Sequence, residues 1–188
     1  RMSHELRTPL NAVLGFAQLL TLDPQLSARS QDHTRRILDA GRHLLAMIND
    51  VLDLARIEAG HAGLAIAAVD LRAALAQALQ MQQPMAEAAG VALIDATGSG
   101  PRAFARADAR RLQQVLANLL SNAIKYNRRG GHVRVRCAAA GALWRIEVED
   151  TGRGLSAAQR AHLFEPFNRL GAEASGVEGT GIGLTVVK

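Results

Sequence analysis

His4 stands close to the start of the chain, in a setting that favours nucleophilic chemistry. If Leu6 and Leu10 occupy core positions of a helical heptad, His4 and Thr8 lie together on the solvent side, one turn apart. Glu5 follows directly and can accept a proton from the imidazole or orient it. An exposed imidazole beside a carboxylate is suited to receive a group from a second substrate. By itself, a lone histidine on a helix surface is the simpler interpretation.

Pro9 lies inside the same predicted helix and strengthens the functional interpretation. It removes the backbone hydrogen bond to the carbonyl of Glu5 and disfavours a helix interior by about 3 kcal/mol. A helix with only a structural role has little reason to carry it. The remaining histidines have no comparable setting, and we interpret them as surface or core residues: His33, His43, His61, His132 and His162.

A second candidate group lies on one helical stripe further along the chain. Asn118, Asn122 and Lys125 are spaced i, i+4 and i+7, with apolar residues around them. Two amides and an ammonium on one face suit phosphate oxygens and a hard cation. A polar, solvated helix face is the alternative, although asparagine is a mediocre helix former.

Two glycine-containing segments could bind a ligand through the backbone. Asp150 follows a predicted strand and precedes Gly152 and Gly154, which would let the backbone approach a ligand closely while the carboxylate accepts a hydrogen bond from an amino group. By itself, an ordinary Asp-Gly turn is the simpler interpretation of this segment. The run 179–184, Gly-Thr-Gly-Ile-Gly-Leu, opens into an apolar segment, so its glycines would lead into a helix N-terminus, where anions bind readily. Its spacing matches neither the dinucleotide fingerprint nor the P-loop.

Two long helices must carry His4. Apolar or small residues recur at alternating spacings of 4 and 3 at positions 6, 10, 13, 17 and 20, and again at 37, 41, 44, 48, 51 and 55. The break at Asp23-Pro24 predicts an antiparallel helical hairpin. Two helices bury too little surface to be stable alone, so we expect a homodimer that forms a four-helix bundle.

The second part of the chain mixes helices and strands. We expect a helix over 71–89, a strand over 91–95, and a helix that Asp108 caps and that runs to about Tyr126. Residues 132–137 and 143–149 alternate in hydropathy and predict a β-hairpin turned at Gly141. The long segment 152–178 is irregular, and segments of that kind are usually functional or disordered.

Composition removes several classes of function. The net charge is +5, but the basic residues are scattered and nearly all arginine, and aromatic residues make up only 3%, so we expect no nucleic-acid partner. The single cysteine, Cys137, excludes a disulfide within the chain. No apolar run approaches the roughly 18 residues of a membrane span, so we expect no membrane contact within this segment.

The motifs, taken in order, resemble those of the sensor histidine kinases of two-component signalling, and the resemblance covers essentially the whole chain. Residues 3–14 resemble the H box of the dimerisation and histidine-phosphotransfer domain. Residues 118–126 resemble the N box, 150–154 the first Gly box, 164–167 the F box and 179–184 the second Gly box.

The resemblance implies a role for each matching residue. His4 would be the phosphoacceptor, assisted by Glu5, and Thr8 would position water for dephosphorylating the partner. Asn122 with Asn118 would hold Mg²⁺ on the triphosphate, Lys125 would contact phosphate, and Asp150 would bind the adenine amino group. The remaining implied ATP-binding residues are Tyr126, Gly152, Gly154, Gly179, Thr180, Gly181, Gly183 and Leu184. Residues 152–178 would form a lid over ATP.

The resemblance also implies an α+β organisation. Residues 1–60 would form the helical hairpin and 61–68 a linker, and 69–188 would form an α/β sandwich with a mixed sheet, the catalytic ATP-binding domain. Because that domain continues past the second Gly box in the family, we expect this one to be C-terminally truncated. The implied partner is a response-regulator receiver domain. The implied location is cytoplasmic, with any membrane tether outside these residues.

Two other functions are alternatives to ATP-dependent phosphorylation of His4. A chaperone-type or mismatch-repair-type ATPase would share the Asn and Gly boxes but lack the helix with His4 and Glu5. An ATP-binding scaffold, or a net phosphatase of a response regulator, would keep the same boxes without strong kinase activity.

Overall fold

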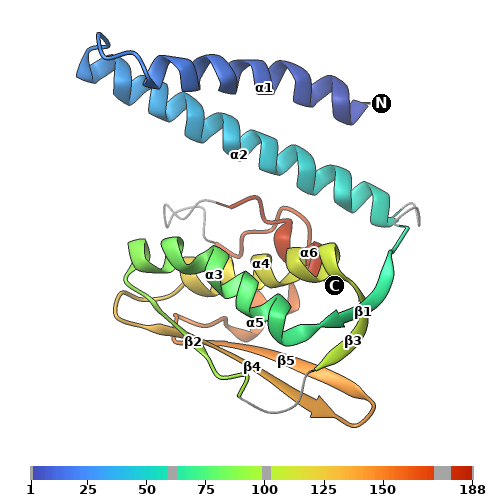
Figure 1. Cartoon of the computed structure of the whole chain (residues 1–188). Coiled ribbons are helices and arrows are strands. Elements are labelled where there is room, and N and C mark those ends of the chain that lie inside the picture. Colours follow the sequence, from blue (N-terminus) through green and yellow to red (C-terminus); the bar gives the residue numbers. More distant parts are fainter. Residues whose placement is uncertain (1, 59–62, 99–102, 172–178, 188) are drawn as a thin grey trace. The chain divides into compact units, whose positions relative to one another are not determined.

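The computed structural model describes residues 2–58, 63–98, 103–171 and 179–187, and the chain forms two compact units, residues 1–62 and 63–188 (Figure 1). The first unit is a hairpin of two long helices, α1 (Met2–Thr21) and α2 (Ala28–Glu58). Ser27 starts α2, because its hydroxyl accepts a hydrogen bond from the backbone N–H of Ser30 at 3.1 Å. The predicted helical hairpin is therefore confirmed.

The core of this hairpin differs from the predicted seam. Leu14, Ala17 and Leu38 are buried, and Leu10 and Leu45 pack against them. Gly41 lets the helices approach, since a Cβ there would lie 2.7 Å from Leu14 Cδ2.

Most of the predicted seam is exposed within one chain, at Leu6, Val13, Leu20, Ile37, Leu44 and Val51. Of the predicted seam, Leu10, Ala17 and Gly41 lie in the contact between α1 and α2 of one chain, and the four-helix bundle stays a prediction. The physical reason for the exposure is that the apolar stripe is wider than a two-position seam, so a single hairpin covers only one edge of it.

In the described residues of the second unit, nine helices and strands are present, and the strands form two sheets. Strands β1 (Ile66–Asp70) and β3 (Phe104–Asp108) form an antiparallel pair. In the three-stranded sheet, β2 (Ala92–Asp95) runs parallel to β4 (His132–Ala140), and β4 runs antiparallel to β5 (Leu143–Asp150), so the sheet is mixed as predicted. The helices are α3 (Leu71–Ala89), α4 (Ala109–Lys125), α5 (Ala157–Ala161) and α6 (Gly183–Val187).

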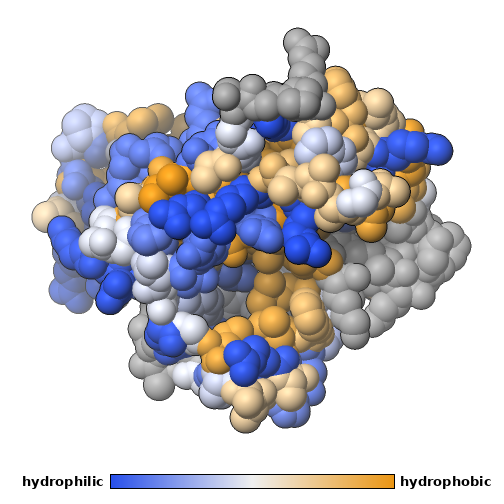
Figure 2. All heavy atoms as spheres, turned by 90° about the horizontal axis from the view of Figure 1, so that it is seen from below, coloured by the Kyte–Doolittle hydropathy of each residue, from blue (hydrophilic) through white to orange (hydrophobic). Residues whose placement is uncertain are grey.

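Helices α3 and α4 cover one face of the three-stranded sheet (Figure 1). The buried residues of α3 and α4 pack with Val133 and Val135 of β4 to form the core, and each of these residues is at most 8% exposed. The core residues from the two helices are Ala74, Leu75, Ala78, Leu79, Ala86, Leu116, Leu120, Ala123 and Ile124. The opposite face carries ion pairs between β4 and β5, such as Arg136 Nη2 to Glu149 Oε2 at 3.2 Å. Figure 2 views the molecule from that side, and hydrophilic side chains gather over the middle of the surface it shows.

Local rules predicted the boundaries of α3 and α4 well, whereas α5 was missed, because it lies within the segment 152–178 that we expected to be irregular. Asp70 and Asp108 each accept hydrogen bonds from two backbone N–H groups in the first turn of α3 and α4. Helix α3 ends at Gly90, which adopts a left-handed conformation with φ of 67°. The predicted hairpin of β4 and β5 is confirmed and extends to Ala140 and Asp150.

Strands β1 and β3 were missed. Residues 66–68, which we expected in the linker, belong to β1, because they pair with residues 106–108 of β3. Both strands are short, and their residues are mostly exposed or half-buried, so no apolar alternation marks them in the sequence. The rest of the expected linker includes residues 61 and 62, which lie outside the described residues.

In the part of the chain that the structure describes, no helix is long and apolar enough to span a membrane.

Candidate functional site

Helix α4 carries the predicted polar stripe. Asn118 and Asn122 are half-buried, and Lys125 is exposed in the last turn. Asn118 Nδ2 donates a hydrogen bond to the carbonyl oxygen of Gly183 at 3.0 Å. The structure therefore brings the start of α6, within the second glycine segment, against the first asparagine of the stripe.

Asp150 ends β5 and lies at the surface beside the end of α4. Its Oδ1 accepts a hydrogen bond from the backbone N–H of Gly152 at 2.8 Å. Gly152 in turn lies against the backbone of Tyr126, the C-cap residue of α4, and a Cβ at Gly152 would collide with the Tyr126 carbonyl oxygen. The glycine is thus required by close packing, and that packing joins Asp150 to the C-terminal end of the polar stripe.

Arg153 is a neighbouring residue that sequence reasoning missed. Its guanidinium lies 5.4 Å from the centroid of the Tyr126 ring, within the range of a cation–π contact. Gly154 follows with φ of 65°, in open space. The sequence shows an arginine between two glycines, but only the packing of Gly152 against Tyr126 reveals which ring it meets.

The second glycine segment leads into α6. Gly181 has φ of 72°, and a Cβ there would lie 2.8 Å from the carbonyl carbon of Phe167, so a side chain has no room. The Phe167 N–H donates to the Gly181 carbonyl oxygen at 3.1 Å. Ile182 is fully buried, and its N–H donates to Thr180 Oγ1 at 3.3 Å, whereas Gly179 and Leu184 are half-buried. Residues 172–178 of the predicted lid lie outside the described residues.

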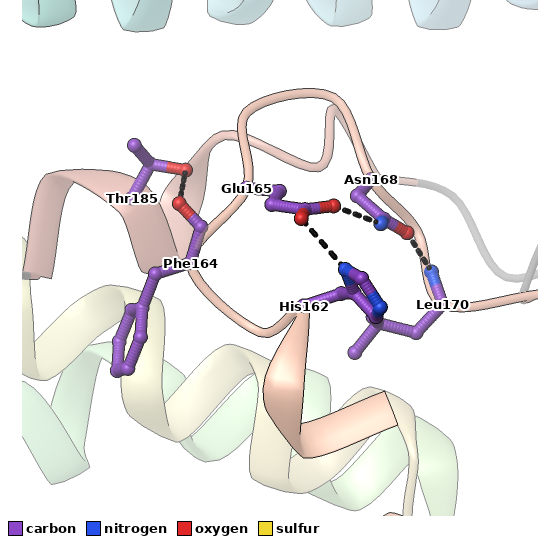
Figure 3. Close-up of polar contacts among 6 residues, drawn as sticks. All are labelled: His162, Phe164, Glu165, Asn168, Leu170 and Thr185. Carbon is purple, nitrogen blue, oxygen red and sulfur yellow. Dashed lines mark hydrogen bonds and ion pairs between the residues drawn. The ribbon is translucent and has the colours of Figure 1, made fainter. Parts of the chain in front are cut away.

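The segment between the two glycine segments is held by a carboxylate (Figure 3). Glu165 Oε1 lies 2.6 Å from His162 Nδ1, and its Oε2 accepts from Asn168 Nδ2 at 2.8 Å. These hydrogen bonds, that from His162 first, lower the pKa of Glu165. Thr185 of α6 donates to the carbonyl oxygen of Phe164 at 3.3 Å. His162 is exposed, one of the two settings that we expected for it, and it has a specific partner that the sequence did not indicate.

The predicted phosphoacceptor helix is α1, which begins at Met2 and includes Pro9. Thr8 is exposed on it. The side chains of His4 and Glu5 lie outside what the structure describes.

The donor set of α4 fits a metal ion held through a nucleotide better than a dedicated metal site. Among the described residues, no group of three or more His, Cys, Asp and Glu could hold a metal ion. Asn122 is half-buried, and its side chain makes no hydrogen bond to the rest of the described chain, so an amide oxygen is available. One such ligand fits Mg²⁺, which is usually bound by few protein oxygens plus substrate phosphates.

Two family models match the chain. Residues 1–60 match the His Kinase A phospho-acceptor domain, and residues 107–188 match the histidine kinase-, DNA gyrase B- and HSP90-like ATPase. The helical hairpin thus belongs to the phospho-acceptor family, and most of the second unit matches the ATPase family.

Similar proteins carry the same two parts. The chain is 38% identical to the histidine protein kinase DivJ of Caulobacter vibrioides over 100% of the chain and 32% of DivJ. It is 37% identical to the sensor protein TorS of Escherichia coli over 98% of the chain and 20% of TorS. A solved structure of full-length ShkA in complex with AMPPNP superposes with a TM-score of 0.79 at 36% identity, over 99% of this chain and 38% of that one.

The chain belongs to the sensor histidine kinases. It spans between 19% and 36% of the length of eight curated relatives that it matches.

Proposed function

We propose that this chain is the autophosphorylating core of a histidine kinase, which transfers the γ-phosphoryl group of ATP to His4. The observation that carries the proposal is the close approach of Asp150 to the end of the polar stripe on α4, through the contact of Gly152 with Tyr126. A carboxylate at one end and two amides with an ammonium along the helix match the adenine and the triphosphate of one nucleotide.

Each group has a defined task in this proposal. Asp150 accepts a hydrogen bond from the adenine amino group, and Lys125 neutralises phosphate charge. Asn122, with Asn118 beside it, supplies an amide oxygen to Mg²⁺, which when bound offsets the negative charge of the phosphates. Tyr126 and the glycine segments 152–154 and 179–184 line the nucleotide.

At the acceptor, an imidazole nitrogen of His4 attacks the γ-phosphorus, and the bond from that phosphorus to the bridging oxygen of ADP breaks. ADP leaves with the electron pair of that bond, and Glu5 accepts the proton that the imidazole releases. The phosphoryl group then passes to an aspartate of a response-regulator receiver domain. Such chemistry requires positioning and charge neutralisation rather than a covalent catalyst beyond the histidine itself.

The exposed side of the hairpin supports a homodimer. Val13, Phe16 and Leu19 of α1 are 51%, 69% and 63% exposed, and Ile37 and Leu44 of α2 are 47% and 45% exposed. A second copy of the hairpin would cover this surface in a four-helix bundle. We place the segment in the cytoplasm, where ATP and a response regulator are available.

A net phosphatase remains the second candidate, because Thr8 is exposed on α1 one turn after His4. A hydroxyl in that place could position water for removing the phosphoryl group from the partner.

The test is phosphorylation of the full chain with γ-labelled ATP and Mg²⁺, followed by acid and base treatment. We expect acid-labile, base-stable label that disappears in His4→Ala and persists in His33→Ala, a matched change at an exposed histidine of α2. Absence of label despite ATP binding would refute the kinase and favour the phosphatase or scaffold. Label that survives in His4→Ala would mean that another residue is the acceptor.

A further inference from the structure

Side-chain hydrogen bonds tie the end of α4 to the neighbouring ends of β4 and β5. Asn127 Nδ2 donates to the carbonyl oxygens of Ala123 and His132, both at 3.1 Å. The hydroxyl of Thr151 lies 3.1 Å from Asn127 Oδ1 and accepts a hydrogen bond from the backbone N–H of His132 at 2.9 Å. We call Asn127, Thr151 and the backbone of His132 the strand-end cluster.

The strand-end cluster is tightly packed, and the Thr151 hydroxyl has both a donor and an acceptor within it. Gly131 is buried beside it, and a Cβ there would lie 2.6 Å from Thr151 Oγ1 and even closer to Asn127 Oδ1. The Thr151 hydroxyl has one proton, and Asn127 Oδ1 is a nearer acceptor than the His132 carbonyl oxygen at 3.3 Å. Thr151 therefore accepts from the start of β4 and donates to the loop after α4.

The position of the cluster links the two ends of the proposed nucleotide site. Thr151 follows Asp150 directly, and Asn127 follows Tyr126 directly. The backbone N–H of Thr151 also donates to the His132 carbonyl oxygen at 3.2 Å, which holds the end of β5 in place. Any movement of Thr151 moves the adjoining Asp150 relative to α4.

We propose that Thr151 and Asn127 are positioning residues for nucleotide selection, which hold Asp150 where its carboxylate accepts a hydrogen bond from adenine and rejects guanine. This inference rests on the proposed function. Adenine presents an amino donor where guanine presents the O6 acceptor, so a carboxylate held in place favours the first and repels the second. The discrimination depends on the carboxylate being held, because a mobile one can turn away from O6.

The informative change is Thr151→Val, which keeps the shape and removes the hydroxyl. It leaves the His132 N–H without its partner in a half-buried place, whereas Asn127 Oδ1 keeps the hydrogen bond that it accepts from the Arg128 N–H at 2.9 Å. We expect the affinity for an ATP analogue to fall about five- to tenfold, the size of one hydrogen bond. We expect the preference for adenine over guanine to fall by a similar factor, with kcat at saturating ATP unchanged.

The experiment is calorimetric titration of the full chain with AMPPNP and with GMPPNP in the presence of Mg²⁺. Thr151→Ser retains the hydroxyl and should keep the wild-type preference. Thr97→Val is the matched control, because Thr97 is half-buried after β2 and its hydroxyl makes no hydrogen bond to a described residue. Asn127→Asp, which loses both amide donors, should reduce the preference as Thr151→Val does, and it serves as the test if Thr151→Val does not fold.

A purely structural cluster would give another result. Thermal destabilisation of Thr151→Val with an unchanged preference for adenine would overturn the inference, and so would a loss of preference in Thr151→Ser. Failure of the wild-type chain to bind either analogue would instead refute the proposed function. If Asp150→Asn abolishes AMPPNP binding while Thr151→Val and Asn127→Asp keep the wild-type preference, the proposed adenine contact stands and only the positioning role falls.

Discussion

Gly152→Ala is the substitution whose effect on nucleotide binding follows most directly from the packing. A Cβ at this position would lie 2.8 Å from Asp150 Oδ1 and 3.1 Å from the Tyr126 carbonyl carbon, with the Tyr126 carbonyl oxygen closer still. Ordinary contacts of a Cβ begin at 3.4 Å, and two of these three neighbours are backbone atoms that cannot turn aside. The glycine segment must therefore shift relative to Tyr126, and this shift displaces the adjoining Asp150.

The size of the effect can be estimated from overpacking in proteins, which typically costs about 1–3 kcal/mol. If this displacement falls on the adenine contact, the affinity for ATP drops roughly 5- to 150-fold. The hydrogen bond from the Gly152 N–H to Asp150 should also lengthen, which would leave the carboxylate less well oriented. The free energy of unfolding should fall by less than the free energy of ATP binding, because the segment is at the surface.

Two other glycines provide controls for the same added methyl group. Gly63 has open space and no unusual φ, so Gly63→Ala should bind ATP like the wild type. Gly154 also has open space but a φ of 65°, so Gly154→Ala adds about 1 kcal/mol of backbone strain without pushing on Asp150. The assay is calorimetric titration with AMPPNP, accompanied by thermal melting. Wild-type affinity in Gly152→Ala, or a larger loss in Gly154→Ala, would refute the reasoning.

Two further predictions concern stability and assembly. Hydrogen bonds from the backbone N–H groups of Ala65 and Arg111 lower the pKa of Asp108 in the folded chain. The ionised Asp108 carboxylate therefore stabilises the fold above the ordinary carboxyl pKa, and this stabilisation is lost as the pH falls through the lowered pKa. Asp108→Asn keeps a good capping residue and should flatten the fall in melting temperature in acid; an unchanged pH profile would contradict this. In the hairpin, Val13 is 51% exposed in one chain, so Val13→Asp should give folded monomers in light scattering. Leu14 is only 8% exposed, so Leu14→Ala should lower the melting temperature without a comparable loss of dimer. A dimer that survives Val13→Asp would contradict the proposed interface.

Local chemistry determined the elements that could be predicted from the sequence. The limits of α3 and α4 follow from capping by Asp70 and Asp108 and from Gly90, because these residues act on the backbone within a few positions of themselves. The stripe of Asn118, Asn122 and Lys125 follows from helical periodicity alone. The motifs in order were enough to indicate the family.

Tertiary structure decided which residues meet. The pairing of β1 with β3 joins segments about forty residues apart, and neither strand has an alternation strong enough to reveal it. The choice of Leu14 and Leu38 for the hairpin core depends on how closely Gly41 lets α2 approach α1. Likewise, the contact of Gly152 with Tyr126 and the bonds among Asn127, His132 and Thr151 exist only because a strand end is packed against a helix end. Spacing along a chain encodes which face of an element a residue occupies, whereas contacts between distant elements depend on how their surfaces fit together.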